Sequence, residues 1–357
     1  MTAAGKTVLW WGRFDPDYSR NRILRQAYAA LGWQIADFRP WLSALGDVEA
    51  VVRGAARADL VHVPCFRQRD IAAARRYARR RGLPLLVDPL ISAYDKQVFE
   101  RGKLAEGSPP AQRLLRAERL LLQAADAVLA DTPEHARFFA GTLGVDPAHL
   151  HVVYVGAEEA LFAPGAAGAP NPIPEVLFYG SFIPLQGPEV IVEAARRYQG
   201  PPVRWTLLGD GPLRDPCQRQ ASGLDSVTFA SWVPYALLPA RIRQADILLG
   251  VFGTTPKAQR VIPNKVFQAL ACGKPLVTCR APAYPDELLE SENCGIRWVP
   301  AGDAGALARA VAELAAQPQQ RAALGAQART SYEQFFAAER VREQLRAALA
   351  GRALRRG

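Results

Sequence analysis

Val261 to Pro275 read VIPNKVFQALACGKP, a pattern that predicts a short helix and then a strand. Pro263 suits the start of a helix because it fixes φ and has no N–H to donate, and Asn264 suits the cap. Apolar side chains then recur at helical spacing as far as Gly273, a residue typical of a helix end. The apolar run Leu276–Thr278 that follows predicts a strand. This stretch therefore indicates one helix-to-strand unit of an α/β protein.

Lys265 is an unexpected residue at the start of this helix. A cation in the first turn opposes the helix dipole, at a cost of about 0.3–1 kcal/mol. That cost is understandable if the ammonium and the free backbone N–H groups bind an anion together. Gln268 lies three residues on, on the same face, and could reach a neighbouring hydroxyl. The alternative is a solvated lysine on an ordinary helix.

Composition limits the class of protein. The 357 residues exceed what one hydrophobic core usually serves, so we expect two domains. No apolar run reaches the ~18–20 residues that span a bilayer, and the N-terminus lacks the features of a signal peptide. We therefore expect a cytoplasmic protein. Five cysteines without C-x-x-C spacing argue against a disulfide framework or a zinc site.

The formal net charge of +10 indicates anionic partners. Phosphorylated substrates, an anionic membrane surface and nucleic acid all fit this charge. The basic stretch Arg75–Arg81 is interpreted as a solvated helix end, with contact to anionic lipid headgroups as the alternative. A nucleic-acid binder is disfavoured, because the basic residues are scattered and no recognition module is present.

Short apolar runs alternate with amphipathic helical stretches along the chain, which is typical of βαβ units and a parallel sheet. The predicted strands of the first half are Thr7–Trp11, Leu60–Val63, Leu83–Val87, Ala127–Ala130 and Val152–Val155. Those of the second half are Val176–Tyr179, Val203–Leu208, Val227–Ala230, Ile247–Val251, Leu276–Thr278 and Ile296–Val299.

A Pro-, Gly- and Ala-rich segment over 163–174 reads as an interdomain linker. We therefore predict an N-terminal Rossmann-like domain over 1–165 and a second over 174–330. A C-terminal helix over 331–357 is expected to pack back toward the first domain. The predicted architecture is α/β, with two doubly wound parallel sheets facing each other across a cleft, and strand carboxyl ends are where such folds place their ligands.

Glycines follow two successive predicted strands of the second half. Gly180 precedes Ser181, and Gly209 precedes Asp210. Glycine at such a position lets the backbone approach a nucleotide closely. Lys265, with Gln268 on its helix, comes next in chain order and opens a loop on the same sheet edge.

These motifs resemble the retaining GT-B glycosyltransferases of glycosyltransferase family four, almost throughout residues 176–315. The segments that carry the resemblance include VLFYGSFIPLQGPEVIVEAARR, WTLLGDGPLRD and IPNKVFQALACGKPLVT. The first half matches more loosely, through ADLVHVPCF, LPLLVDPL and AADAVLADTPEHA. The resemblance implies a nucleoside-diphosphate-sugar donor on the C-terminal domain and an acceptor on the N-terminal domain. It also implies that the protein needs no metal and no cofactor.

The resemblance also assigns site residues. Lys265 falls at a diphosphate-contacting position, and Gln268 replaces the glutamate that usually holds the ribose. Ser181 and Gln186 stand where an arginine and a lysine are expected. Asp88 stands where a histidine usually lies near the donor sugar, and we expect it to be catalytic with Lys265. The predicted donor-binding residues are Gly180, Ser181, Gly209, Asp210, Arg260, Asn264, Lys265, Gln268, Arg13 and Arg20.

Cations elsewhere could compensate for the missing pair, and these are Lys257, Arg260, Arg13, Arg20 and Arg22. His62, inside a predicted strand, is interpreted as a packed residue, and His135 as a residue of a helix start. If the reaction inverted configuration, a carboxylate such as Asp88, Asp17 or Asp95 would have to act as general base.

Three functions remain open from the sequence. The first is a glycosyltransferase acting with retention on a cell-envelope glycan, a glycolipid or a glycosylated metabolite, peripheral to the inner face of a membrane. The second is an isomerase like the nucleotide-sugar 2-epimerases, although no convincing carboxylate–histidine cluster is apparent. The third is a non-catalytic nucleotide-sugar-binding protein, suggested by the lost cations.

Overall fold

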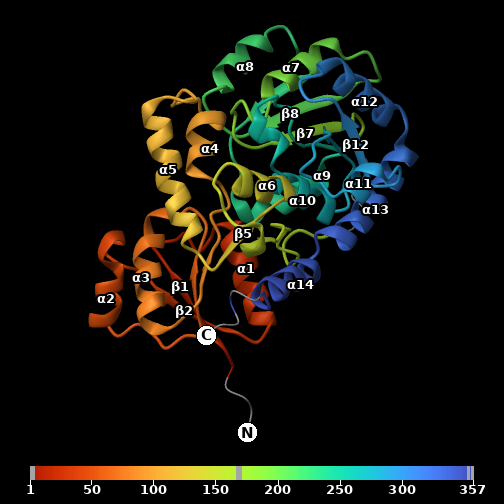
Figure 1. Ribbon diagram of the computed structural model, residues 1–357. Coiled ribbons are helices and arrows are strands. Elements are labelled where there is room, and N and C mark those ends of the chain that lie inside the picture. Colours follow the sequence, from red (N-terminus) through yellow and green to blue (C-terminus); the bar gives the residue numbers. More distant parts are fainter. Residues whose placement is uncertain (1–4, 166–170, 352–353, 355–357) are drawn as a thin grey trace. The chain divides into compact units, whose positions relative to one another are not determined.

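The computed structural model describes residues 5–165, 171–351 and 354 (Figure 1). The chain divides into two compact units, which we treat separately. Unit 1 comprises Met1–Val155 with Ala338–Gly357, and unit 2 comprises Gly156–Ala337. Part of the predicted linker over 163–174 lies outside the described residues.

Unit 1 is built on a six-stranded parallel sheet of order β2-β1-β3-β4-β5-β6. Its strands are β1 (Thr7–Trp11), β2 (Gln34–Phe38), β3 (Leu60–Val63), β4 (Leu85–Val87), β5 (Ala127–Ala130) and β6 (Leu150–Val152). Its helices are α1 (Ser19–Ala30), α2 (Gly46–Val52), α3 (Ile71–Arg81), α4 (Ala93–Asp95), α5 (Pro109–Gln123), α6 (Pro133–Gly141) and α14 (Ala338–Leu349). Its short helical turns are η1 (Ser43–Leu45), η2 (Gln68–Asp70), η3 (Lys96–Glu100) and η4 (Pro147–His149).

Unit 2 repeats the plan, with the order β12-β11-β10-β7-β8-β9 and every strand parallel. Its strands are β7 (Glu175–Tyr179), β8 (Arg204–Leu208), β9 (Val227–Ala230), β10 (Ile247–Leu249), β11 (Leu276–Cys279) and β12 (Ile296–Val299). Its helices are α7 (Pro188–Arg197), α8 (Arg214–Gln220), α9 (Leu238–Gln244), α10 (Asn264–Ala271), α11 (Asp286–Glu290), α12 (Ala304–Ala316) and α13 (Pro318–Phe335), with turns η5 (Tyr235–Leu237) and η6 (Pro256–Gln259).

Both sheets reverse their strand order next to the first strand of the unit. In unit 2, β7 lies between β8 and β10. The chain adds β8 and β9 on one side of β7, and then β10, β11 and β12 on the other side. The carboxyl ends of β7 and β10 flank this switch point, where doubly wound sheets leave room for a ligand. The loop between β10 and β11 contains η6 and α10, so the opening stretch of sequence lies at this edge.

The predicted doubly wound fold is confirmed. Besides strand ends that differ by one or two residues, three local corrections are needed. Strand β2 was not predicted, because its sequence QIADF is half polar and lies at the sheet edge, where only Phe38 is buried. The last strand of the first half is Leu150–Val152 and not Val152–Val155, since the chain leaves the sheet after Val152 and remains buried.

The third correction concerns the cap of α10. Pro263 occupies the N-cap position with extended backbone (φ −73°, ψ 152°), and Asn264 is the first helical residue. The extended conformation that proline favours is also the N-cap conformation, so the helix begins one residue earlier than expected. No side chain caps the helix start, so its first N–H groups have no such partner. Gly273, at φ +65°, ends the helix as predicted.

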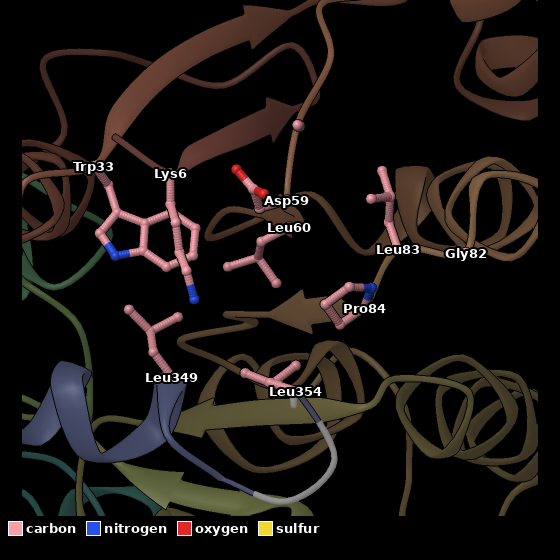
Figure 2. Close-up of a pocket in the computed structure, with 10 residues that line it drawn as sticks. Lys6, Trp33, Asp59, Leu60, Gly82, Leu83, Pro84, Leu349 and Leu354 are labelled. Carbon is pink, nitrogen blue, oxygen red and sulfur yellow. The ribbon is translucent and has the colours of Figure 1, made fainter. Parts of the chain in front are cut away.

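The last helix belongs to unit 1. Helix α14 packs against α1 and β6, and the Gln344 side chain accepts a hydrogen bond of 3.0 Å from the Tyr154 N–H. A cavity of about 230 Å³ lies at the amino ends of β1, β3 and β4 (Figure 2). Lys6 and Trp33 line one side of it, and Leu349 and Leu354 contribute to its wall. The C-terminal segment thus packs at the amino edge, away from the strand ends discussed below.

Candidate functional site

Two glycines open the carboxyl edge of the unit 2 sheet. Gly209 follows β8 with φ +136°, and a Cβ there would lie 2.0 Å from the Gly180 carbonyl oxygen, so no other residue fits. A Cβ at Gly180, after β7, would lie 2.7 Å from the Lys265 Nζ. Ser181 and Asp210, the residues that follow, are exposed. Glycine at position 209 therefore lets the loops after β7 and β8 lie close together, and glycine at position 180 leaves space for the Lys265 ammonium.

Lys265 is buried at the start of α10, so the interpretation as a solvated surface lysine is wrong. Its Nζ donates to the Gln186 side-chain oxygen at 2.5 Å and lies 3.8 Å from the ring centre of Phe178. No carboxylate among the described residues forms an ion pair with it. Burial lowers the pKa of Lys265 well below its ordinary value. An ammonium in this place lacks the counter-ion that buried charges require.

Gln268 lies on the same helix face and is also buried. The Tyr179 hydroxyl donates to its side-chain oxygen at 2.9 Å and lies 3.3 Å from the Lys265 carbonyl oxygen. In this structure Gln268 thus contacts a hydroxyl of the protein, and its expected contact with the donor ribose stays a prediction. Tyr179 ends β7 and so links the strand to the start of α10.

The remaining predicted residues of unit 2 lie close along the chain to α10. Lys257 is buried within η6, and Arg260 and Asn264 are half-buried between η6 and the first turn of the helix. The structure thus collects two further cations in the loop that leads to Lys265. Asp210 lies at the end of β8, where its carboxylate accepts from the Gly211 N–H at 2.7 Å and shapes the turn.

One residue near this edge was missed by the sequence analysis. Trp232 follows β9 by two residues and is 51% exposed, although large apolar side chains are usually covered. A Cβ at Gly209 would lie 3.3 Å from its indole ring, so the ring borders the same turn. The signal available in the sequence was a tryptophan two residues after a predicted strand. In the sheet that strand lies beside β8, whose end carries Gly209.

In unit 1, the predicted residues Asp88 and Arg20 form one buried ion pair. Asp88 directly follows β4, and both residues are fully buried. The Arg20 Nε lies 2.9 Å from Asp88 Oδ2, and its Nη2 lies 3.3 Å from Oδ1. Its Nη1 donates to the carbonyls of Val153 and Tyr154. Burial raises the pKa of Asp88, and Arg20 opposes that rise.

Arg13 is not brought to this pair. It is exposed, and its Nη1 donates to the Trp41 carbonyl at 3.2 Å. Asp17 is exposed as well, and Arg22 lies 3.7 Å from its carboxylate. Of the three predicted arginines of unit 1, Arg20 is therefore internal, Arg13 is exposed and Arg22 is half-buried.

A histidine with two carboxylates lies buried near the strand ends of unit 1. Thr132 caps α6 as predicted, and the His135 Nδ1 is hydrogen-bonded to Asp131, while its Nε2 lies 3.8 Å from Asp95. Burial opposes protonation, but the two carboxylates outweigh it and raise the pKa of His135 to about 9. The imidazole is thus a cation at neutral pH. This buried cluster was not recognised in the sequence.

His62 is a packed strand residue, as predicted. It is fully buried on β3, where its ring stacks on Trp10 at 4.1 Å between ring centres and its Nδ1 meets the Tyr28 hydroxyl at 3.1 Å. Burial lowers its pKa well below the ordinary value, so it stays neutral.

Both halves of the chain match family models of one enzyme class. Residues 173–317 match the model described as "Glycosyl transferases group 1", and residues 12–156 match the "Glycosyl transferase 4-like domain". Together the two models cover well over half of the chain. The chain belongs to the GT-B glycosyltransferases.

Relatives and solved structures agree with this family. The D-inositol 3-phosphate glycosyltransferase of Mycobacterium tuberculosis (strain ATCC 25618 / H37Rv) is 28% identical over 258 residues, which is 66% of this chain and 52% of that protein. The chain thus spans about half the length of the curated relatives it matches. Among solved structures, Anabaena HepE in complex with UDP covers 97% of this chain and 99% of its own, with a TM-score of 0.70 and 16% identity.

Sucrose-phosphate synthase from Thermosynechococcus elongatus has a TM-score of 0.72 at 21% identity, over 96% of this chain and 98% of its own. At such identities these structures support the GT-B fold alone. Within this GT-B chain, the predicted residues fall on the strand ends of two Rossmann-like units. No described helix is both long enough and apolar enough to span a membrane.

Proposed function

We propose that the chain transfers a sugar from a nucleoside-diphosphate sugar to an acceptor, and that unit 2 binds the donor. The observation that carries the proposal is Lys265, buried without an acid partner at an uncapped helix start. A donor diphosphate would supply the missing counter-ion and accept from the free N–H groups of α10. Gly180 and Gly209 would let the backbone approach it.

Uridine diphosphate is the donor nucleotide that we favour. HepE was solved with UDP and with UDP-glucose, and it shares the fold over nearly the whole chain. The proposal includes transfer of a hexose without a metal, because Lys265 with the helix start can stabilise the charge on the departing diphosphate. Arg260 and Lys257 lie in the preceding loop and add positive charge there.

We also propose that configuration at the anomeric carbon is retained. In that route an oxygen of the donor phosphate takes the acceptor proton on the same face, so no protein base is required. Asp88 supports this choice, because it is fully buried and both of its oxygens accept from Arg20, which is a poor placement for a general base. The role of Asp88 beside the donor sugar stays a prediction. NMR of the product would reveal inversion, which would contradict the retaining route.

Thermal stabilisation tests the donor assignment. UDP should raise the melting temperature of the chain more than GDP, ADP or dTDP, because a ligand that binds only the folded state stabilises it. UDP linked to glucose or another hexose should then be converted when candidate glycan, glycolipid or sugar acceptors are added. No stabilisation by any nucleoside diphosphate would overturn the proposal.

Replacing Trp232 with alanine should weaken UDP binding selectively. We place the exposed indole against the base, and aromatic stacking on a base contributes about 1–3 kcal/mol. The variant should lose that amount for UDP in a calorimetric titration and nothing for inorganic pyrophosphate. Leu237→Ala is the matched control, since Leu237 is similarly exposed in the nearby turn η5. Equal loss for both ligands would show that Trp232 shapes the site without touching the base.

A further inference from the structure

Exposed apolar side chains gather on one stretch of unit 1. Of the eight large apolar side chains that are well exposed among its described residues, six lie in the twelve residues from 41 to 52. The exposed fractions are 72% for Trp41, 59% for Leu42, 52% for Leu45, 52% for Val48, 53% for Val51 and 78% for Val52. We call these six residues the apolar patch. Single exposed apolar residues are normal on a protein surface, whereas a cluster of this size marks an interaction site.

Helical geometry places the patch on one outward face. The segment comprises η1 and α2, and Leu45, Val48 and Val52 recur at the spacing of one helix stripe. The opposite face of α2 carries the buried Ala50 and packs on α3, which lies between α2 and the sheet (Figure 1). The stripe therefore points away from the core, where an ordinary surface helix carries charged residues.

Both acidic residues of the segment are turned inward. Asp47 is 2% exposed on its side chain and binds the guanidinium groups of Arg76 and Arg80 at 2.6 Å and 2.8 Å. Glu49 accepts from the backbone N–H groups of Trp41 and Leu42, which ties the loop to the helix. The outward face of the segment is thus left without a free negative charge.

Arginines border the patch. Arg13, Arg39 and Arg53 line an open hollow of about 410 Å³ together with Phe14, Pro40 and Trp41. The Arg39 guanidinium lies 4.5 Å from the ring centre of Phe14, and that of Arg53 lies 4.9 Å from the ring centre of Trp41. Ring stacking occupies the flat face of a guanidinium. The Arg53 Nη1 donates to the Arg39 carbonyl and to the Glu49 carboxylate, so the Arg39 guanidinium and the remaining N–H groups of Arg53 are the ones that face phosphate oxygens.

We propose that the apolar patch with its arginine border docks unit 1 onto an anionic phospholipid surface. The apolar stripe would enter the boundary between headgroups and acyl chains, and the arginines would bind lipid phosphates. An acidic protein would satisfy the arginines but would not call for six exposed apolar side chains beside them. The inference goes beyond the proposed sugar transfer, because the patch contains none of the donor-binding residues of unit 2.

An environment-sensitive dye attached at position 48 tests the insertion. The five native cysteines are buried, so the thiol of Val48→Cys can be labelled selectively. The dye should shift to the blue with vesicles of phosphatidylcholine and phosphatidylglycerol, and less with phosphatidylcholine alone. Leu120→Cys is the matched control, since Leu120 is 72% exposed on α5 outside the patch. An equal shift at both positions, or none at position 48, would overturn the proposal.

Co-sedimentation with the same vesicles tests the two contributions separately. Val48→Ser combined with Val52→Ser should lower the partition coefficient at least about tenfold, whereas Leu120→Ser should leave it unchanged. Arg39→Gln with Arg53→Gln should remove the preference for phosphatidylglycerol. Both double variants should keep the UDP affinity of the parent chain, measured by calorimetry.

The readouts separate this inference from the proposed function. Loss of vesicle binding with intact UDP binding supports the patch, whatever the acceptor is. A chain that binds anionic vesicles through the patch but no nucleotide would refute the proposed function alone. If Val48→Ser with Val52→Ser abolished self-association in light scattering and left vesicle binding unchanged, the patch would be an interface between copies, and the membrane proposal would fail.

Discussion

Replacing Arg20 with methionine should lower the free energy of unfolding by about 3–5 kcal/mol, the usual result of breaking a buried ion pair from one side. Arg20 and Asp88 are both fully buried, and the guanidinium contacts both carboxylate oxygens. Methionine fills much of the volume but leaves the carboxylate without a counter-ion. Urea denaturation followed by circular dichroism measures the change. A loss below about 1 kcal/mol would show that other groups neutralise Asp88.

The destabilisation should depend on pH in a defined direction. Burial already raises the pKa of Asp88, and loss of Arg20 should raise it further. A carboxyl whose folded pKa exceeds its unfolded value, about 3.9, loses stability as the pH rises between the two values. Arg20→Met should therefore cost less in acid, where Asp88 is protonated in both states, than at neutral pH. A constant cost would indicate that the lost carbonyl hydrogen bonds to Val153 and Tyr154 dominate.

The double variant Arg20→Met with Asp88→Leu separates structure from catalysis. Removing both charges should recover most of the lost stability, because a well-packed apolar pair often replaces a buried ion pair at little cost. Asp88→Asn should reduce sugar transfer while UDP binding in unit 2 persists, if the expected role near the donor sugar is right. Recovery of both stability and turnover in the double variant would leave Asp88 a purely structural residue.

The fold could be predicted because most of its strands can be recognised from a few consecutive residues. Buried parallel strands are apolar runs, and the run in Leu60–Val63 or Ala127–Ala130 has no other plausible reading between helical stretches. Strand β2 escaped because an edge strand is half solvated and its residues need not be apolar. The N-cap of α10 lies one residue earlier than predicted. The φ angle that proline imposes suits the N-cap position as well as the first helical position, so the sequence does not distinguish the two.

The site was only partly predictable, because its decisive features are non-local. The spacing of Lys265 indicated an anion site, yet its burial against Phe178 and Gln186 depends on how the loop after β7 folds. Arg20 looked available to a ligand, and only the fold brings it to Asp88, 68 positions away. The stripe Leu45, Val48 and Val52 would be taken for a buried helix face from sequence alone, whereas the structure leaves it exposed.

Replacing Lys265 with methionine should weaken UDP binding by about one to two orders of magnitude, which is the loss of one charge-assisted hydrogen bond worth about 1.5–3 kcal/mol. Methionine is preferable to alanine because Lys265 is buried, and alanine would leave a cavity. Inorganic pyrophosphate should lose affinity to the same degree, since the ammonium would bind the diphosphate and not the base. Calorimetric titration with both ligands provides the measurement.

The same variant should be more stable than the parent chain without ligand. Burial lowers the pKa of Lys265, so the unfolded state binds its proton more tightly, and folding is penalised at every pH below the unfolded lysine pKa of about 10.4. Stability of the parent chain should rise with pH between the two pKa values, and Lys265→Met should remove that slope. A stability curve that the substitution leaves unchanged would mean that the lysine head remains hydrated.

Proton uptake on binding connects these two effects. A diphosphate beside the ammonium should raise the pKa of Lys265 back toward its ordinary value, so UDP should bind with uptake of a proton above the lowered pKa. Its affinity should then fall as the pH rises, and Lys265→Met should abolish the uptake, seen by calorimetry in buffers of different ionisation enthalpy. Gln268→Ala, the matched variant one helical turn away, should keep the proton uptake and weaken uridine and UDP alike, because its expected partner is the ribose. Equal UDP affinity in the Lys265→Met and parent chains would remove the lysine from the donor site.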